Sequence, residues 1–407
     1  MKRFALLLLA ALLFSLALSA CGSSAPECED SIGCVTIAPD EPLHLAYMLT
    51  ISGATAFLGE DSRGAIQIAI DDRGGKLLDH DISLTGEDSL CSPEGGQTAA
   101  QKVAADTSVI GIIGTNCSGA AVSALPIISE AGLVLISPSN TNPGLTDKAQ
   151  TWQPGYYRTA HNDLFQGRVA ADFAYNELGA RTAATIHDGS PYADGLQGVF
   201  VDRFKELGGE VTFQGAVNVG DTDMRPILTN VAADSPDILY FPIFEPEGNF
   251  VAAQSQEIPG LENTILFGAD GLLVEGFASN TGPAAVDMYL SGPYVQGGAY
   301  EELLAKWDAK FGGAPPSGFH GHAYDATNIL LDAIEKVAIV GDDGTVLIPR
   351  QALRDAITAT SGFNGVTGTL ACNETGDCAT GEALGIYKLT DAEVSGGNWP
   401  PEAIWTP

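Results

Sequence analysis

The sequence contains few basic residues and many acidic ones. Lysine and arginine number 19 in 407 residues, against 51 aspartates and glutamates, and the formal net charge is −32. DNA and RNA are bound largely through phosphates by lysine and arginine, so this balance argues against nucleic acid as a partner. A charge of this size favours solubility and repels anionic surfaces. It says little about a small ligand, because the groups around a binding site determine the electric field there.

Long hydrophobic runs are missing after the N-terminus, so no later segment is predicted to span a bilayer. The start, "MKRFALLLLAALLFSLALSAC", has two cations, a long apolar stretch and small residues before Cys21, which indicates a signal peptide over residues 1–20. The ending "LSAC" resembles a bacterial lipobox, so we expect Cys21 to be lipidated and residues 21–42 to be a tether. The protein would then be exported and anchored to the outer face of the cell membrane or in the periplasm. An ordinary signal peptide followed by an incidental cysteine is the alternative.

Signatures of catalysis are also missing. The sequence has no G-x-S-x-G, no H-E-x-x-H, no Walker lysine and no G-x-G-x-x-G after its first predicted strand. The only close histidine pair, His320-x-His322, is a candidate metal site, but two ordinary histidines near a helix start are the simpler interpretation. We therefore expect no metal, no cofactor and no enzymatic reaction. An extracellular enzyme on an α/β scaffold remains an alternative.

Six cysteines remain besides Cys21, and no C-x-x-C motif occurs among them. They form three pairs that are close in sequence, and an exported location permits disulfides. Three disulfides are therefore favoured over a metal site, with the pairing Cys28–Cys34, Cys91–Cys117 and Cys372–Cys378.

Strands and helices alternate from about residue 43. "LHLAYML" is predicted as a strand, "EDSRGAIQIAIDDRGG" as a helix, and "SPEGGQTAAQKVAAD" as a helix capped by Ser92. The alternation restarts after "YYRTAHNDLFQG", which predicts two Rossmann-like lobes with parallel sheets and a hinge of several crossovers. The predicted lobes are residues 43–159 plus 293–345, and residues 160–292 plus 346–407.

Polar residues of the first lobe follow two buried strands, where open α/β sheets bind ligands. Ser118 follows "VIGIIG" and is expected to cap a helix. Its hydroxyl and the free amides of Gly119 and Ala120 are suited to an anion. After "LVLIS" come three more polar residues, Ser139, Asn140 and Thr141. Singly, these residues are better explained as a helix cap and a turn.

Two residues of the second lobe also follow predicted strands. Asp270 follows "TILFG", and Tyr192 follows "TAATIHD". Taken with the first lobe, they put anion-binding groups on one side of a cleft and a carboxylate on the other. A zwitterion between the lobes satisfies both, which predicts an amino-acid ligand.

Several stretches resemble the leucine/isoleucine/valine-binding proteins, the type I substrate-binding proteins of ABC importers. The more specific ones are "VIGIIGTNCSGAA" and "ISPSNTNPGLT"; "GAIQIAIDDRGG", "RTAHNDLFQG", "HDGSPYADGL" and "FGADGL" add to them. The resemblance covers residues 43–392. It implies the type I periplasmic-binding-protein fold, a branched-chain amino acid as ligand, an ABC permease as partner and a monomer. Binding of an amide, urea or aromatic solute, or a sensory role, are the alternatives.

The resemblance also implies a role for each site residue. Ser118 and Thr141 match positions that bind the ligand carboxylate, with backbone groups of Ser139 and Asn140. Asp270 matches the acid that binds the ammonium, although relatives have the longer glutamate. Further ligand contacts are implied for Tyr192, Phe319, Phe244 and either Phe57 or Leu58. The pair Cys91–Cys117 matches a disulfide of the family.

Overall fold

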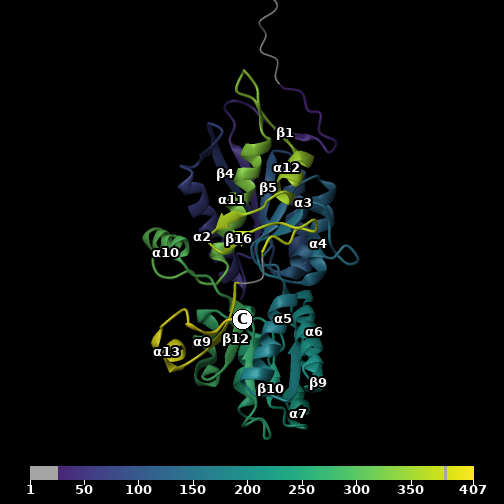
Figure 1. The fold of residues 1–407 in the computed structure, drawn as a ribbon, viewed down its shortest axis with the longest axis vertical. Helices are drawn as coiled ribbons and strands as arrows, with labels where there is room; N and C mark the ends of the chain where they lie inside the picture. The colour runs from purple at the N-terminus through teal and green to yellow at the C-terminus, as the bar shows by residue number, and fades with distance from the viewer. Residues whose placement is uncertain (1–25, 380–382) are drawn as a thin grey trace, which may run out of the picture.

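The computed structural model describes residues 26–379 and 383–407. The predicted signal peptide (residues 1–20) and Cys21 lie outside the described residues. Figure 1 shows two lobes stacked along the longest axis, each with helices packed around a central sheet. This architecture confirms the predicted two-lobed α/β fold. No helix of the described ranges is both long enough and apolar enough to cross a bilayer.

The first lobe is built on a six-stranded sheet in the order β3-β4-β2-β5-β6-β7. Neighbouring strands are parallel except β3 and β4. The strands are β2 (Leu43–Leu49), β3 (Lys76–Leu77), β4 (His80–Asp88), β5 (Val109–Gly114), β6 (Leu135–Ser137) and β7 (Tyr156–Arg158). The helices and helical turns are α2 (Ala56–Asp72), α3 (Pro93–Ala105), α4 (Ser118–Glu130), η1 (Pro143–Thr146), α10 (Gly298–Phe311), α11 (His320–Val337) and α12 (Arg350–Thr358).

The first lobe also has two small antiparallel units. One is a three-stranded sheet in the order β1-β14-β13, and the other is the hairpin β15-β16. Their strands are β1 (Cys34–Ile37), β13 (Ile339–Val340), β14 (Val346–Pro349), β15 (Phe363–Gly365) and β16 (Gly368–Leu370).

The second lobe has a seven-stranded sheet in the order β18-β17-β12-β11-β10-β8-β9. Five strands are parallel, and β17 and β18 complete one edge in antiparallel pairing. The strands are β8 (Thr182–His187), β9 (Glu210–Ala216), β10 (Ile238–Tyr240), β11 (Ile265–Gly268), β12 (Tyr289–Pro293), β17 (Leu384–Lys388) and β18 (Ala403–Trp405). The helices and turns are α5 (Asp163–Asp172), η2 (Phe173–Glu177), α6 (Pro191–Glu206), α7 (Arg225–Ala232), α8 (Glu247–Ser255), η3 (Asp270–Leu272), α9 (Glu275–Thr281), η4 (Gly282–Ala285) and α13 (Asp391–Gly396).

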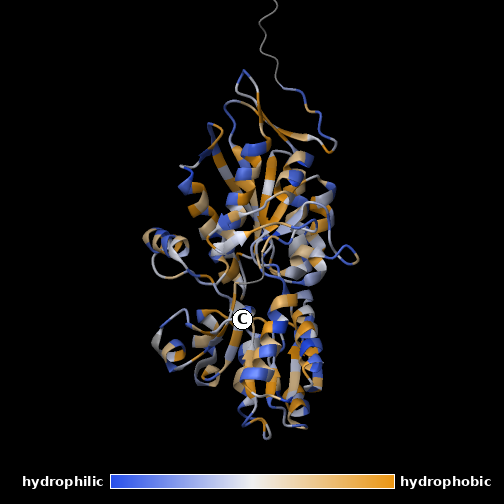
Figure 2. Ribbon diagram, viewed as in Figure 1, coloured by the Kyte–Doolittle hydropathy of each residue, from blue (hydrophilic) through white to orange (hydrophobic). Residues whose placement is uncertain are grey.

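Local sequence explains how these elements form. All six residues of β5, "VIGIIG", are buried, as expected for a parallel strand covered on both faces. The predicted cap of α3 is confirmed, because Ser92 Oγ accepts a hydrogen bond from the amide of Gly95 at 3.1 Å and Pro93 is the first helical residue. Figure 2 shows apolar residues concentrated in the central strands and hydrophilic ones on the outer helices.

The tether is shorter than predicted. Residues 34–37 form β1 and pair with β14 of the first lobe. Val35 and Ile37 point to the same face of the strand and are buried in the core of that lobe. This part of the predicted tether therefore belongs to the folded domain.

The end of the chain is divided between the lobes, whereas the sequence predicted that all of residues 346–407 enter the second. β14 and α12 lie in the first lobe, where Leu353 and Leu370 contribute to its core, and β17 and β18 join the second sheet. The chain thus crosses between lobes after β7, after β12 and between β16 and β17. Hydrophobic periodicity identifies an element without indicating which sheet it covers.

All six cysteines of the described residues form disulfides in the predicted pairing, Cys28–Cys34, Cys91–Cys117 and Cys372–Cys378. The second of these joins the segment after β4 to the residue before α4. It therefore fixes the start of α4, where the sequence predicts an anion-binding group.

Candidate ligand-binding site

A small cavity lies between the lobes and is lined by residues of both. Its volume is about 10 Å³, which is the scale at which a pocket admits a single water. The lobes are therefore closed on each other, and an amino acid requires them to part. The lining residues are Leu58, Asn116, Cys117, Ser118, Ser139, Tyr192, Phe244, Asp270 and Phe319.

Ser118 lies at the start of α4, but it does not cap the helix as predicted. The N-cap is Cys117, whose side chain makes no capping hydrogen bond because it is tied to Cys91. Ser118 Oγ instead accepts a hydrogen bond from the amide of Asn142 at 3.3 Å. The amide of Ala120, which was expected to be free, donates to the carbonyl of Cys117 at 3.1 Å.

Arg158, a fully buried residue of β7, holds the loop after β6 in place. Its guanidinium donates to the carbonyl oxygens of Asn140 (3.2 Å) and Asn142 (2.8 Å) and to Thr146 Oγ1 (2.8 Å), and it pairs with Asp377. A buried guanidinium with these partners holds the loop in one conformation. Arg158 was not predicted from the sequence, where its only signal is a lone cation in the buried stretch "YYRT".

Of the three loop residues predicted from the sequence, only Ser139 lines the cavity. Its hydroxyl donates to the carbonyl of Asn116 at 3.1 Å. Asn140 and Thr141 are fully buried beneath it. Within the described ranges, the hydroxyl of Thr141 and the side-chain nitrogen of Asn140 have no hydrogen-bond partner. Asn116, which was not predicted, bonds to Leu58 O and to Ser139 and so joins α2 to this loop.

Asp270 and Tyr192 face the cavity from the second lobe, as predicted. Oδ1 of Asp270 accepts hydrogen bonds from the hydroxyl of Tyr192 at 2.8 Å and from Nε2 of Gln166 at 2.7 Å. Burial raises the pKa of Asp270 to about 6, although these two hydrogen bonds lower it. Burial also raises the pKa of Tyr192, so the hydroxyl remains a donor. Both side-chain bonds end on Oδ1, which leaves Oδ2 for another donor.

A second acid, Asp163, lies near Asp270 and was not identified from the sequence. It is the first residue of α5 and is fully buried, and neither of its carboxyl oxygens has a hydrogen-bond partner in the part of the chain described. Burial, and then the charge of Asp270, raise its pKa well above the ordinary value, while Thr141 and Arg158 oppose the rise. Because neighbouring buried acids resist ionising together, Asp270 is the one that carries the negative charge first.

Apolar side chains complete the cavity. Phe319 and Phe244 line it as predicted, and the rings of Tyr192 and Phe244 lie 4.9 Å apart. Of the two candidates at the start of α2, Leu58 lines the cavity and Phe57 does not. Helix α2 begins at Ala56, four residues earlier than the predicted helix, so Leu58 turns inward on its first turn.

The two lobes also touch beside the cavity. Nδ2 of Asn142, in the first lobe, donates a hydrogen bond to the carbonyl of Pro191 at the start of α6. Oδ1 of the same side chain accepts from the amide of Gly144 at 2.8 Å. Asn142 therefore organises its own loop and contacts the opposite lobe at the same time.

His320 and His322 both make hydrogen-bonding contacts with other residues of the fold. Nδ1 of His320 lies 3.1 Å from Oδ1 of Asp61, and Nδ1 of His322 lies 2.9 Å from the carbonyl of Thr159. Burial lowers the pKa of His322 to about 4. Among residues 26–379 and 383–407, no group of three or more histidines, cysteines or acids is arranged as metal ligands.

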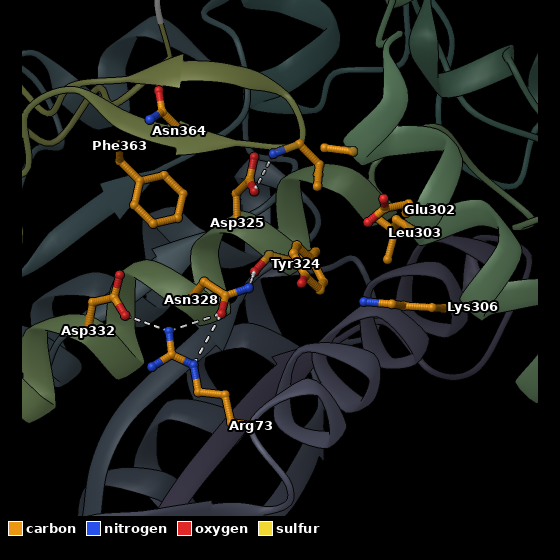
Figure 3. A pocket seen from close by; sticks show the side chains of 12 residues that line it. Arg73, Glu302, Leu303, Lys306, Tyr324, Asp325, Asn328, Asp332, Phe363 and Asn364 are labelled. Carbon is orange, nitrogen blue, oxygen red and sulfur yellow. Dashed lines mark hydrogen bonds and ion pairs between the residues drawn. The ribbon is translucent and has the colours of Figure 1, made fainter.

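A separate pocket of about 310 Å³ lies within the first lobe, between α2, α10, α11 and the hairpin β15-β16 (Figure 3). Arg73 donates to Asn328 and pairs with Asp332 at 2.5 Å, and Lys306 pairs with Asp72 at 2.8 Å. Its two cations are already paired, and all of its lining comes from one lobe. Closure of the lobes cannot act on such a pocket, so it does not match the predicted site.

Comparisons with known proteins agree with the two-lobed fold. A sequence profile of the family described as periplasmic binding protein matches residues 42–392. An amino acid binding protein of Pseudomonas aeruginosa is 30% identical over 290 residues, which cover 69% of this chain and 75% of the relative. The Leu/Ile/Val-binding protein BraC3 of Rhizobium johnstonii is 27% identical over 358 residues, 86% of this chain and 92% of the relative.

Solved structures show the same fold. A leucine binding protein LivK from Thermotoga maritima has a TM-score of 0.79 at 24% identity and covers 90% of this chain and 99% of its own. LivJ from Streptococcus pneumoniae, in complex with isoleucine, has a TM-score of 0.77 at 22% identity, and the match covers 90% of this chain and 100% of LivJ. A solute binding protein from R. palustris in complex with benzoate has a TM-score of 0.75 at 21% identity, and the match covers 90% of this chain and 96% of that protein. The predicted resemblance is thus confirmed, and the chain belongs to the periplasmic binding protein family.

Proposed function

We propose that this protein is an extracytoplasmic, lipid-anchored binding protein that captures a branched-chain amino acid between its lobes and delivers it to an ABC importer. The main support is one juxtaposition. Ser118, at the positive end of α4, and the buried carboxylate of Asp270 line the same cavity from opposite lobes. The carboxylate of an amino acid is complementary to the first and its ammonium to the second. Binding, closure and release then require no chemical step.

The carboxylate would bind on the first lobe. Ser118 lines the cavity at the start of α4, and its Oγ contacts the loop that Arg158 holds. The unpartnered hydroxyl of Thr141 supports a part for this residue, because buried polar groups normally find a partner. Opening of the lobes would bring Thr141 within reach of the ligand.

The ammonium would bind on the second lobe. Oδ2 of Asp270 is available, and Tyr192 and Gln166 fix the orientation of the carboxylate through Oδ1. A ligand with no positive charge leaves this buried anion without a counter-ion, which is costly in a low-dielectric site. This favours an amino acid over benzoate, urea or a simple amide. Leu58, Phe244 and Phe319 would contact an aliphatic side chain.

Hinge motion would connect binding to transport. The closed cavity of about 10 Å³ cannot admit an amino acid, so capture follows opening about the three crossovers. Closure then removes water and strengthens the charge-assisted hydrogen bonds. The closed form, stabilised by the ligand, is the one that a permease would recognise.

Isothermal titration calorimetry of the mature chain tests the ligand. We expect leucine, isoleucine or valine to bind, and isobutyramide, urea and benzoate not to bind. Asp270→Asn should weaken amino-acid binding at least tenfold. Binding of benzoate or an amide alone would contradict the assignment of the ammonium site. Hydrolysis of ester, peptide or phosphate substrates would contradict the binding role altogether.

Fractionation of cells tests the anchor. We expect the full-length chain to remain with the membrane and Cys21→Ala to be released in soluble form. Uptake of labelled leucine should fall when the gene is deleted. Tight binding without any effect on uptake would favour a sensory role instead.

A further inference from the structure

A second, larger groove lies where the two lobes meet at the hinge. Its volume is about 570 Å³, within the range of small-molecule sites, which is about 300–1,000 Å³. One wall belongs to the first lobe: α10, the loop after it and the start of α11. The other belongs to the second lobe: the ends of β12 and β17 and the segment before β18. None of its lining residues lines the interlobe cavity described above.

Four aromatic side chains line the groove. Tyr294, Tyr387 and Trp399 come from the second lobe, and Tyr300 comes from the first. Tyr294, Tyr300 and Trp399 are only partly buried, so solvent reaches their rings. Prolines of both lobes add further apolar surface. Such a lining binds the body of an organic molecule and attracts a positive charge to the ring faces.

The charged groups at the groove are acidic. Asp308 and Glu402 line it and are exposed, and no lysine or arginine is among its lining residues in the described ranges. Lys306 and Lys310, on the same helix as Asp308, are directed to α2, where they pair with Asp72 and Asp71. No cation of α10 therefore neutralises the acids.

A chain of hydrogen bonds orients the hydroxyl group of Tyr300 at the groove. Nδ1 of His320 lies 2.9 Å from the carbonyl of Ser317, which can only accept, so Nδ1 carries the proton. Nε2 of the same ring lies 2.7 Å from the hydroxyl of Tyr300, and Nδ1 also lies 3.1 Å from Oδ1 of Asp61. The ring of His320 also stacks on Tyr300, with 5.3 Å between centroids.

We propose that this groove is a second binding site, specific for an organic cation that joins an ammonium group to an aliphatic or aromatic body. The rings of Tyr300 and Trp399 contact the body and the ammonium, and Asp308 and Glu402 supply the compensating charge. An anionic aromatic solute is repelled by the same two acids. The site is independent of the amino-acid cavity in its residues and in the charge it selects.

The position of the groove couples it to closure. An occupant contacts both lobes beside the crossover after β12, so its affinity differs between open and closed forms. Any ligand with such a difference shifts the equilibrium between the forms, and the effect on the amino acid is reciprocal. The cation and the amino acid therefore alter each other's affinity without sharing a contact.

Calorimetry of the mature chain with benzyltrimethylammonium tests the proposal, with benzyl alcohol and phenylacetate as neutral and anionic analogues. We expect the cation to bind at least tenfold more tightly than either analogue. Trp399→Ala should weaken it at least tenfold. The pair Asp308→Asn and Glu402→Gln should also weaken it about tenfold. This double variant should fold normally, because both side chains are exposed and the amide that replaces the carboxylate of Asp308 keeps an oxygen to accept from the amide of Gly313.

Asp270→Asn is the control that separates the two sites. It should leave binding of the cation unchanged whether or not the amino acid binds as proposed. Loss of cation binding in this variant would place the cation in the interlobe cavity and overturn the proposal. Equal affinity for the cation and benzyl alcohol, or no effect of the two exposed substitutions, would overturn it as well.

Discussion

The hydroxyl group of Tyr192 donates a hydrogen bond to Oδ1 of Asp270 across 2.8 Å and accepts one from the amide of Gly271 at 3.2 Å. The phenol thus holds the carboxylate in place and stabilises its ionised form. Since burial raises the pKa of Asp270 to about 6, this single bond affects both the orientation and the charge of the proposed ammonium site.

Affinity for the amino acid should depend on pH near 6. Below this value Asp270 is protonated and no longer attracts an ammonium, so the Kd for leucine should rise about tenfold per pH unit. Tyr192→Phe removes a bond that lowers this pKa and should move the midpoint upward. Calorimetry between pH 4.5 and 8 measures both effects. Tyr175→Phe, elsewhere in the second lobe, is the control; a midpoint unchanged in Tyr192→Phe would contradict the prediction.

Asp270→Asn should stabilise the ligand-free protein at neutral pH. The pKa is raised from 3.8 in the unfolded chain to about 6 in the fold, so the carboxylate costs stability as the pH rises through this window. A shift of about two units corresponds to about 3 kcal/mol at pH 7.5, and the difference should vanish below pH 4. Urea denaturation at both pH values measures it. A less stable variant at pH 7.5 would contradict the assignment of an ionised, buried Asp270.

Asp325→Asn is a matched control for the binding measurement. Burial raises the pKa of Asp325, too, to about 6, but this residue lies in the first lobe, where it accepts hydrogen bonds from the amides of Val366 and Thr367. Leucine affinity should be unchanged in this variant after allowance for stability. A loss equal to that in Asp270→Asn would show that the effect is not specific to the cavity.

Asn142→Asp should weaken closure without disturbing the loop. Aspartate retains the oxygen that accepts from the amide of Gly144 but cannot donate to the carbonyl of Pro191. The loss of one hydrogen bond between the lobes should raise the Kd about three- to tenfold. Small-angle scattering of the ligand-free chain should show a larger radius of gyration. If both the scattering profile and the affinity were unchanged, the hydrogen bond between Asn142 and Pro191 would not contribute to closure of the lobes.

Ser118→Ala should reduce affinity for leucine about tenfold, because a hydrogen bond to a charged group contributes about 1.5–3 kcal/mol. Ser123→Ala, on the same helix but not at its start, should have no such effect. Thermal shift with and without leucine compares the two variants. Equal behaviour would remove Ser118 from the carboxylate site.

The fold was predictable because its signals are local. The buried run of β5 and the cap of Ser92 identify their elements directly. The lobe to which β14 and α12 belong depends on contacts between distant segments, such as Val35 against Ile348, and no periodicity in the sequence encodes these. For the same reason the sequence did not indicate that residues 34–37 belong to the folded domain.

The candidate site was predictable where residues follow a strand. Ser118, Ser139 and Asp270 all lie at the carboxyl ends of strands and line the cavity. Arg158 and Asp163 were missed because each acts through residues far along the chain. Arg158 meets its partner Asp377 only after the chain has crossed back to the first lobe, and Asp163 is defined by its nearness to Asp270.

The three crossovers determine how the molecule can be divided. The first lobe is assembled from two stretches of chain separated by most of the second, and the second sheet obtains β17 and β18 only from the last residues. No single cut in the gene therefore yields a complete lobe. A fragment ending after β12 would expose the edge of that strand, where Leu290 normally pairs with Tyr387. Exchange of lobes between relatives must then transfer at least two separate segments.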